Sequence, residues 1–217
     1  MTGHVITVAQ QKGGSGKTTI AIHLAVAFSS AGKSVALLDT DPQGSLGRWF
    51  MERHSSSDGA PGLEFGTASA WGVTYECEKL AKSHDIVIVD TPPKIDADLR
   101  PALRIADLVL IPVTTSQMDV WALENIRELA EREDCATLVV LNRVPPRARL
   151  TSEIVEQIDG TGLERATHHL GNRVAYAAAM GQGKSATEGA RSQTARTEIS
   201  ALATEISERL EALTESA

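Results

Sequence analysis

The chain has 217 residues, of which 42 % are hydrophobic, 23 % charged and 4 % aromatic, and its net charge is −7. These proportions are those of an ordinary globular protein. The acidic balance excludes a surface that is basic throughout, although it allows a local basic patch. We expect one domain, residues 1–217, with a core built mainly from Val, Ile, Leu and Ala.

The two cysteines are too far apart in sequence to predict a metal site or a disulfide framework. They are Cys77 and Cys135, and we interpret them as thiols of a reduced, cytoplasmic protein. The N-terminus runs directly into the first predicted strand, so no signal peptide is expected. No apolar run approaches the length of a membrane span, so we expect no membrane association through such a segment.

Apolar runs alternate with helical patterns along the chain. The runs that predict strands are His4–Ala9, Val35–Asp39, Ile86–Asp90, Leu108–Val113 and Thr137–Asn142. The segments that predict helices are Thr19–Ala31, Tyr75–Lys82, Leu99–Ile105, Asp119–Arg132 and Ser152–Ile158. Strands that are apolar throughout are buried on both faces. The order therefore predicts an α/β fold, a doubly wound and mainly parallel sheet with helices on both faces.

Two further segments complete the prediction. His54–Gly72 is rich in Ser, Gly and Ala, which indicates an exposed loop leading to a short strand at Leu63–Phe65. Thr197–Leu213 repeats apolar residues on one helical face and carries glutamates on the other. We expect this last helix to pack on the domain, since a helix that binds anionic membrane would be basic.

The stretch Gln11–Thr19, Q-K-G-G-S-G-K-T-T, follows a strand pattern and opens a helix pattern. This is the context of a phosphate-binding loop. Its glycines let backbone N–H groups wrap closely around phosphates, and the helix adds its positive end. Lys17 is predicted to reach the β- and γ-phosphates, and the Thr18 hydroxyl to bind Mg²⁺. The nucleotide-binding set here is Gly13, Gly14, Ser15, Gly16, Lys17, Thr18 and Thr19.

Carboxylates follow two of the buried strands. Asp39 and Asp41 lie in L-L-D-T-D-P-Q-G, and Asp90 ends I-V-I-V-D before Thr-Pro-Pro. By itself the first motif is equally typical of a polar strand end followed by a turn. The second is a Walker B arrangement, which brings a carboxylate close to Mg²⁺, usually through a water molecule.

Together these motifs resemble the ParA/MinD family of deviant Walker A ATPases, and specifically small ParA-type members. The resemblance rests on K-G-G-S-G-K-T-T, D-T-D-P-Q-G and D-T-P-P, in which Lys12 is the family's additional lysine. It implies that Lys12 acts across a dimer interface on the partner's nucleotide. It also implies that Asp41 orients the attacking water, with Lys12, Lys17 and Asp41 as the catalytic set, and that Thr18, Asp39, Asp41 and Asp90 surround Mg²⁺.

The resemblance extends to the second half of the chain. Asn142 and Arg143 correspond to an adenine-binding position, although an Asn that simply ends a strand is an equal alternative. The segment 171–188 resembles the part of the family that closes the adenine pocket and carries part of the DNA-binding face. We expect a basic patch there, although scattered bases are usually only solvated. Its members are Arg147, Arg149, Arg173, Lys184, Arg191 and Arg196.

The implied function is that of an ATPase, slow without its partner, which dimerises with ATP and Mg²⁺ and binds nucleoid DNA without sequence preference. A ParB-like activator or cargo adaptor would stimulate hydrolysis, and the cargo could be a plasmid, a chromosome or a protein cluster. The alternative is a MinD-like regulator of cell division that does not use DNA. An iron–sulfur carrier on this fold would need paired cysteines, and a dethiobiotin synthetase would lack Lys12 and the D-T-D-P-Q element.

Overall fold

The computed structural model describes residues 3–93, 99–146, 149–188 and 192–216. In this part of the chain six strands form one sheet, in the order β3-β2-β4-β1-β5-β6, and all neighbours are parallel. The strands are β1 (His4–Val8), β2 (Val35–Asp39), β3 (Glu64–Thr67), β4 (Ile86–Asp90), β5 (Leu108–Val113) and β6 (Thr137–Leu141). The predicted doubly wound α/β fold is confirmed, and the sheet is entirely parallel rather than mainly so.

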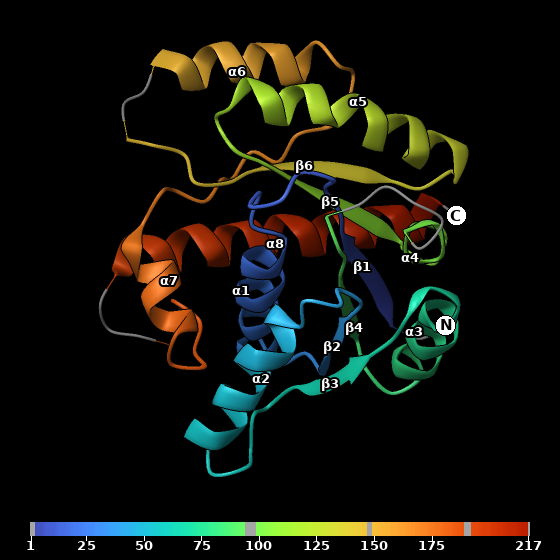
Figure 1. Ribbon diagram of the computed structural model, residues 1–217, viewed down its shortest axis with the longest axis vertical. Helices are drawn as coiled ribbons and strands as arrows, with labels where there is room; N and C mark the ends of the chain where they lie inside the picture. Colours follow the sequence, from blue (N-terminus) through green and yellow to red (C-terminus); the bar gives the residue numbers. More distant parts are fainter. Residues whose placement is uncertain (1–2, 94–98, 147–148, 189–191, 217) are drawn as a thin grey trace.

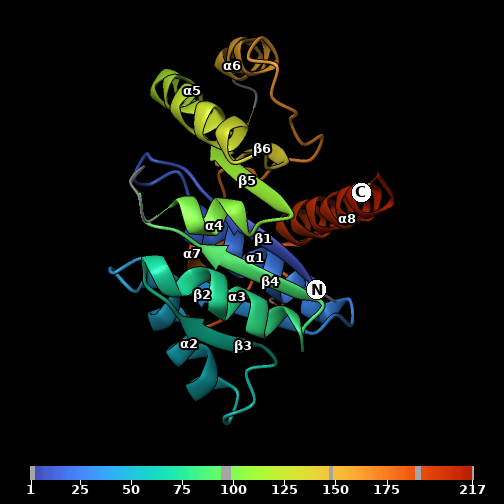
Figure 2. The same ribbon diagram turned by 90° about the vertical axis from the view of Figure 1, so that its right-hand side faces the viewer.

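Helices cover both faces of the sheet (Figures 1 and 2). The α-helices are α1 (Lys17–Ser30), α2 (Ser45–Ser56), α3 (Val73–Ala81), α4 (Arg100–Arg104), α5 (Gln117–Arg132), α6 (Arg149–Asp159), α7 (Val174–Met180) and α8 (Gln193–Ser216). A 3₁₀ turn, η1 (Ala70–Gly72), precedes α3. Every residue of β2, β4 and β5 is buried, because successive side chains point to opposite, helix-covered faces.

The core divides along this alternation. On one face, Ile6, Leu37 and Ile88 pack with α1 and α8. On the other face, Val109 and Val139 pack with α5 and α6, while alternate residues of β1, β2 and β4 meet α3 and α4. Figure 1 shows α8 crossing α1. The helix α1 is therefore enclosed between the sheet and α8, which confirms that the amphipathic C-terminal helix packs on the domain.

The prediction of an exposed loop from His54 is wrong at its first residues, because α2 continues through Ser56. Leu46 and Trp49 are three residues apart and bury the inner face of α2. Phe50 then stacks on Phe65 of β3, with ring centroids 4.7 Å apart. The short strand predicted at Leu63–Phe65 begins one residue later and ends two residues later, because β3 pairs with β2 from Glu64 to Thr67.

Parallel pairing brings the carboxyl ends of β1, β2 and β4 to one edge of the sheet. In the register, Asp90 lies opposite both Val8 and Asp39. The loops that follow these strands contain the glycine-rich segment and the acidic motifs. This edge is where open parallel sheets bind their ligands. The topology therefore gathers the candidate site from segments that are far apart in sequence, such as Thr18 and Asp90, which are separated by 72 positions.

Candidate functional site

The glycine-rich loop joins β1 to the beginning of α1. Gly14 and Gly16 have φ angles of 80° and 95°, a conformation that side chains other than glycine rarely adopt. The helix begins at Lys17 without a side-chain cap and without an acidic residue in its first turn. Its first N–H groups are therefore available to an anionic ligand, and the helix dipole favours negative charge at this end.

Asn142, at the end of β6, supports this loop. Its buried side chain donates from Nδ2 to the Ser15 carbonyl at 2.8 Å and accepts the Arg143 N–H on Oδ1 at 2.9 Å. A Cβ atom placed on Gly16 would lie 2.1 Å from Nδ2, so only glycine fits beside the amide. Both ends of the amide are engaged within the chain. The adenine contact of Asn142 and of the exposed Arg143 stays a prediction.

Lys17 is buried beneath the loop. Its Nζ donates to the Gln10 carbonyl at 2.9 Å. Burial lowers the pKa of Lys17, whereas the nearby Asp90 and Asp41 carboxylates oppose that shift. Lys17 has no ion pair within the part of the chain that the structure describes, and a desolvated ammonium group of this kind is well suited to meet a phosphate. The buried Gln10 was missed in the sequence, since only its place in the fold links it to Lys17.

Thr18 and Asp90 form the strongest indication of a cation site. The Thr18 hydroxyl donates to Asp90 Oδ2 at 2.6 Å, while the buried Oδ1 has no hydrogen-bond partner among the described residues. Burial raises the pKa of Asp90 to about 7. A bound cation would stabilise the ionised form and occupy the free oxygen. Hydroxyl and carboxylate oxygens fit Mg²⁺, which keeps several waters and needs few protein ligands.

No group of three or more His, Cys, Asp or Glu side chains in the described ranges could hold a metal by itself.

The carboxylates of Asp39 and Asp41 differ in the hydrogen bonds that they accept. Buried Asp39 accepts the N–H groups of Asp41 and Gly47, both at 3.0 Å. Among the described residues, the carboxylate of half-buried Asp41 accepts only the Gln43 N–H, at 2.9 Å. Asp39 thus holds the loop after β2 in place, and Asp41 is the carboxylate with free acceptor capacity toward the site. Their roles around Mg²⁺ stay predictions.

Lys12 is bound within its own chain. Its Nζ forms an ion pair with Asp119, which is fully buried, and lies 3.5 Å from the Ser116 hydroxyl. The second oxygen of Asp119 accepts the Thr114 N–H at 2.7 Å. The loop after β5 and the first turn of α5 therefore hold the side chain of this lysine of the phosphate loop. The sequence placed Asp119 only at the start of a predicted helix and did not identify it as the partner of Lys12.

A family model described as the CobQ/CobB/MinD/ParA nucleotide binding domain matches residues 6–186. The chain belongs to this family. Among its curated relatives is the maintenance of carboxysome distribution protein A of Halothiobacillus neapolitanus, with 32 % identity over 93 % of this chain and 95 % of that protein. The chromosome-partitioning ATPase Soj of Thermus thermophilus is 30 % identical over 73 % of this chain and 71 % of its own length.

Solved structures of family members share the fold. Apo McdA from Cyanothece superposes with a TM-score of 0.78 at 18 % identity, covering 93 % of this chain and 98 % of that one. A putative plasmid partition protein of Borrelia burgdorferi, bound to AMPPNP, has a TM-score of 0.75 at 19 % identity, covering 95 % and 99 %. These comparisons confirm the ParA/MinD resemblance. In the part of the chain that the structure describes, no helix is long and apolar enough to cross a membrane.

The predicted DNA-binding residues are only partly placed. Arg147 and Arg191 lie outside the described residues, and the side chain of Arg149, the first residue of α6, is not described. Arg173 is bound by Glu198, with Nε 2.9 Å from Oε2. Arg196 is half-buried in α8, so Lys184 is the exposed member among the described side chains. The basic patch stays a prediction.

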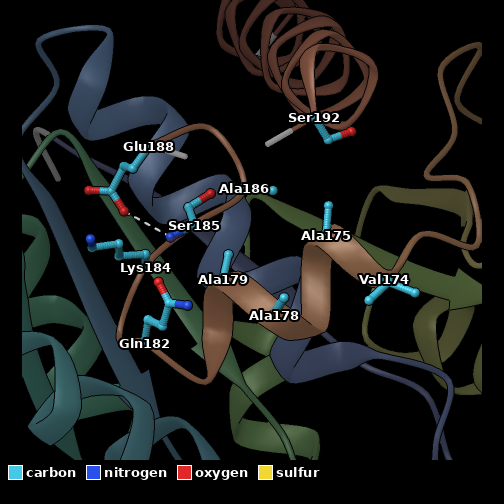
Figure 3. A pocket seen from close by; sticks show the side chains of 10 residues that line it. All are labelled: Val174, Ala175, Ala178, Ala179, Gln182, Lys184, Ser185, Ala186, Glu188 and Ser192. Carbon is cyan, nitrogen blue, oxygen red and sulfur yellow. Dashed lines mark hydrogen bonds between the residues drawn. The ribbon is translucent and has the colours of Figure 1, made fainter. Parts of the chain in front are cut away.

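Lys184 lines a pocket of about 510 Å³ beside α7, a helix that the sequence did not predict. Figure 3 shows alanines of α7 along one side and polar side chains of the following loop along the other. In this loop Glu188 accepts the Ser185 N–H at 2.8 Å and forms an ion pair with Arg53 of α2. The segment after α7 is thus fastened to the rest of the fold by charged contacts.

His23 fastens the same segment to α1. This buried imidazole lies 2.9 Å, through Nδ1, from the Ser185 hydroxyl, and the Ala186 N–H donates to the same nitrogen at 3.3 Å. Nδ1 is therefore the acceptor, and the neutral ring carries its proton on Nε2. Burial lowers the pKa of His23 to about 4. The helix that begins at the phosphate loop is in this way connected to the pocket-lining loop.

We expect His23 to make the protein acid-sensitive. Its pKa is lower in the folded state than the ordinary value of 6.5, so the unfolded chain binds the proton first and stability falls as pH drops from about 6.5 to 4. A shift of that size corresponds to about 3 kcal/mol. Urea unfolding at pH 7 and pH 4.5 should show a smaller pH-dependent loss for His23→Asn than for the wild type. His54→Asn, at an exposed position of α2, should keep the wild-type slope.

Proposed function

We propose that this chain is an ATPase that dimerises with Mg²⁺-ATP and positions an intracellular cargo by binding nucleoid DNA without sequence preference. The observation that carries the proposal is the meeting of Lys17, the Thr18–Asp90 pair and Lys12 around one phosphate loop. When bound, Mg²⁺ would neutralise charge on the β- and γ-phosphates. Thr18 and Asp90 are the residues that would hold it, directly or through water.

The remaining residues act on the nucleotide and the attacking water. Lys17 and the N–H groups at the start of α1 bind and orient the phosphates. Asp41 orients the water, because it is the half-buried carboxylate whose acceptor sites are least used by its own loop. Lys12 exchanges Asp119 for the phosphates of the partner's nucleotide when two subunits meet. The Lys12–Asp119 pair therefore opposes dimerisation until a nucleotide offers a stronger anion.

For the cargo, we propose a large protein assembly. The similarity to the carboxysome distribution protein extends over nearly the whole of both chains, whereas the match to the chromosome-partitioning ATPase Soj covers 71 % of that protein. A separate adaptor, acting as a ParB-like activator, would bind the cargo and stimulate the slow hydrolysis. The dimer would be cytoplasmic and held on the nucleoid while ATP is bound. Release follows when hydrolysis separates the two subunits.

The proposal is tested by DNA binding under controlled salt. With Mg²⁺ and AMPPNP, we expect binding to random duplex DNA at 50 mM salt that weakens steeply by 200 mM, since each phosphate contact contributes about −0.9 to the log–log slope. Fluorescence anisotropy measures this slope. Lys184→Ala should make the slope shallower by about the amount that one phosphate contact contributes. Lys33→Ala, at an exposed turn after α1, should leave the slope unchanged.

Two outcomes would contradict this proposal. Equal binding with ADP and with AMPPNP would show that DNA does not select the ATP-bound dimer. Failure to bind at 50 mM salt would remove the DNA from the mechanism and would favour a MinD-like regulator that does not use DNA.

A further inference from the structure

The side chain of Asn142 is held at both ends of its amide. The backbone N–H of this residue donates to the Val113 carbonyl at 2.8 Å, which extends the pairing of β6 with β5 by one residue. Its Nδ2 donates to the Ser15 carbonyl at 2.8 Å, and its Oδ1 accepts the Arg143 N–H at 2.9 Å. Only 2 % of the residue is exposed. The amide therefore has one fixed orientation, in which it faces the backbone of the phosphate loop.

The backbone directly after Asn142 is strained. Arg143 has a φ angle of 53°, in the left-handed region that residues other than glycine rarely adopt. The hydrogen bond from its N–H to Oδ1 of Asn142 stabilises this conformation. Strained backbone of this kind persists only where the surrounding structure holds it, and it is concentrated at functional sites. The turn therefore indicates that the position of the Asn142 amide serves the site and does more than end a strand.

The contact with Asn142 fixes one peptide group of the phosphate loop, the one that joins Ser15 to Gly16. This peptide is trans, so its C=O and its N–H point in opposite directions. Because the Ser15 carbonyl is turned toward Asn142, the Gly16 N–H is turned away from it. Within the described residues this N–H donates no hydrogen bond, and the buried Ser15 hydroxyl has no partner either. Two polar groups of the same short segment are thus left for a ligand.

The environment of these two groups suits an oxyanion. The carbonyl of Gly16 accepts the Ile20 N–H at 2.9 Å and so begins α1, which places the Gly16 N–H at the positive end of the helix dipole. Lys17, the next residue, adds a buried ammonium group. A phosphate oxygen would satisfy the N–H, which is costly to leave unpaired in a buried site. Asn142 is thus connected to phosphate binding through the backbone, whatever base the nucleotide carries.

We propose that Asn142 is a positioning residue for the triphosphate and not a reader of the adenine base. It holds the Ser15–Gly16 peptide so that the Gly16 N–H is aimed at a phosphate oxygen. This inference rests on the proposed function, because it takes the loop to bind a nucleoside triphosphate. The two roles differ in one measurable respect. A positioning residue affects the binding of inorganic tripolyphosphate as strongly as that of ATP, whereas a residue that reads the base leaves tripolyphosphate binding unchanged.

The test compares three ligands of the full chain by titration calorimetry with Mg²⁺: inorganic tripolyphosphate, AMPPNP and GMPPNP. Asn142→Ala should weaken tripolyphosphate and AMPPNP by the same factor, about tenfold or more, and change the ratio of the AMPPNP and GMPPNP affinities less than about twofold. Asn142→Asp, which keeps the acceptor for the Arg143 N–H but loses the donor to Ser15, should act in the same direction. Asn125→Ala, at an exposed position of α5, should leave all three affinities unchanged. Thermal melts without ligand check the folding of each variant.

Amide NMR of the ¹⁵N-labelled chain gives an independent readout at the peptide itself. In the wild type, Mg²⁺-tripolyphosphate should move the Gly16 amide proton downfield, because hydrogen bonds to charged phosphate oxygens are short and strong. Asn142→Ala should remove most of this shift. The amide of Gly32, in the turn after α1, should respond in neither protein.

Three results would overturn the inference. If Asn142→Ala binds tripolyphosphate normally but loses its preference for AMPPNP over GMPPNP, Asn142 reads the base, and the proposed function still stands. A Gly16 amide that does not respond to tripolyphosphate in the wild type would likewise exclude the positioning role alone. If the wild type binds none of the three ligands, both this inference and the proposed function are overturned.

Discussion

A Lys12→Ala variant is expected to bind ATP but to form no ATP-dependent dimer. In the structure Lys12 contributes to neither the core nor the Gln10–Lys17 and Thr18–Asp90 contacts of the phosphate site. Its contacts are the ion pair with Asp119 and the approach to the Ser116 hydroxyl. Loss of the side chain therefore leaves the monomer's own phosphate contacts in place. It removes the cation that would meet the partner's nucleotide.

Size-exclusion chromatography with light scattering measures this effect, at protein concentrations where the wild type is dimeric with Mg²⁺ and AMPPNP. Lys33→Ala is the matched control, because it removes an exposed lysine from a turn at the other end of α1. Lys12→Ala also leaves Asp119 as a buried carboxylate without its cation. This lowers the free energy of unfolding by several kcal/mol when the carboxylate stays ionised. A double variant with Lys12→Ala and Asp119→Asn removes both charges and so separates this loss of stability from the loss of dimerisation. A dimer of normal affinity in either Lys12 variant would contradict the proposed role.

For Asp41→Asn we expect nucleotide binding and dimerisation to persist while hydrolysis falls by about 10²–10⁴-fold. The amide can still accept the Gln43 N–H, which keeps the turn after β2 intact. It cannot act as the charged acceptor that orients the attacking water. The ATP-bound dimer should therefore accumulate and remain on DNA, because the step that separates its subunits is blocked.

Single-turnover phosphate release measures the hydrolysis step, and DNA retention after dilution measures the lifetime of the dimer. Asp39→Asn is the informative comparison. Asp39 holds the N–H groups of Asp41 and Gly47, so its replacement should lower the free energy of unfolding by about 1–3 kcal/mol. A normal rate of phosphate release in Asp41→Asn, with or without an activating partner, would exclude Asp41 as the residue that orients water.

Much of the fold follows from local pattern. Ile86–Asp90 and Leu108–Val113 are apolar throughout, and the structure buries each of these strands completely. The pattern was weaker at α2, where Ser, Gly and charged residues surround Leu46 and Trp49. In the fold, Leu46 and Trp49 of that helix are buried and Phe50 stacks on Phe65 of β3. A tertiary contact of this kind leaves no local periodicity long enough to recognise.

The sequence by itself determined the family, the parallel sheet and the phosphate loop, because these depend on residue type, spacing and order along the chain. Only the tertiary structure decided which side chains meet. It paired Lys12 with Asp119, clamped the loop with Asn142, separated Asp39 from Asp41 in what each holds, and joined His23 to the loop after α7. The partners of these side chains lie on elements distant in the chain. Their contacts come from strand order and helix packing, which no local pattern encodes.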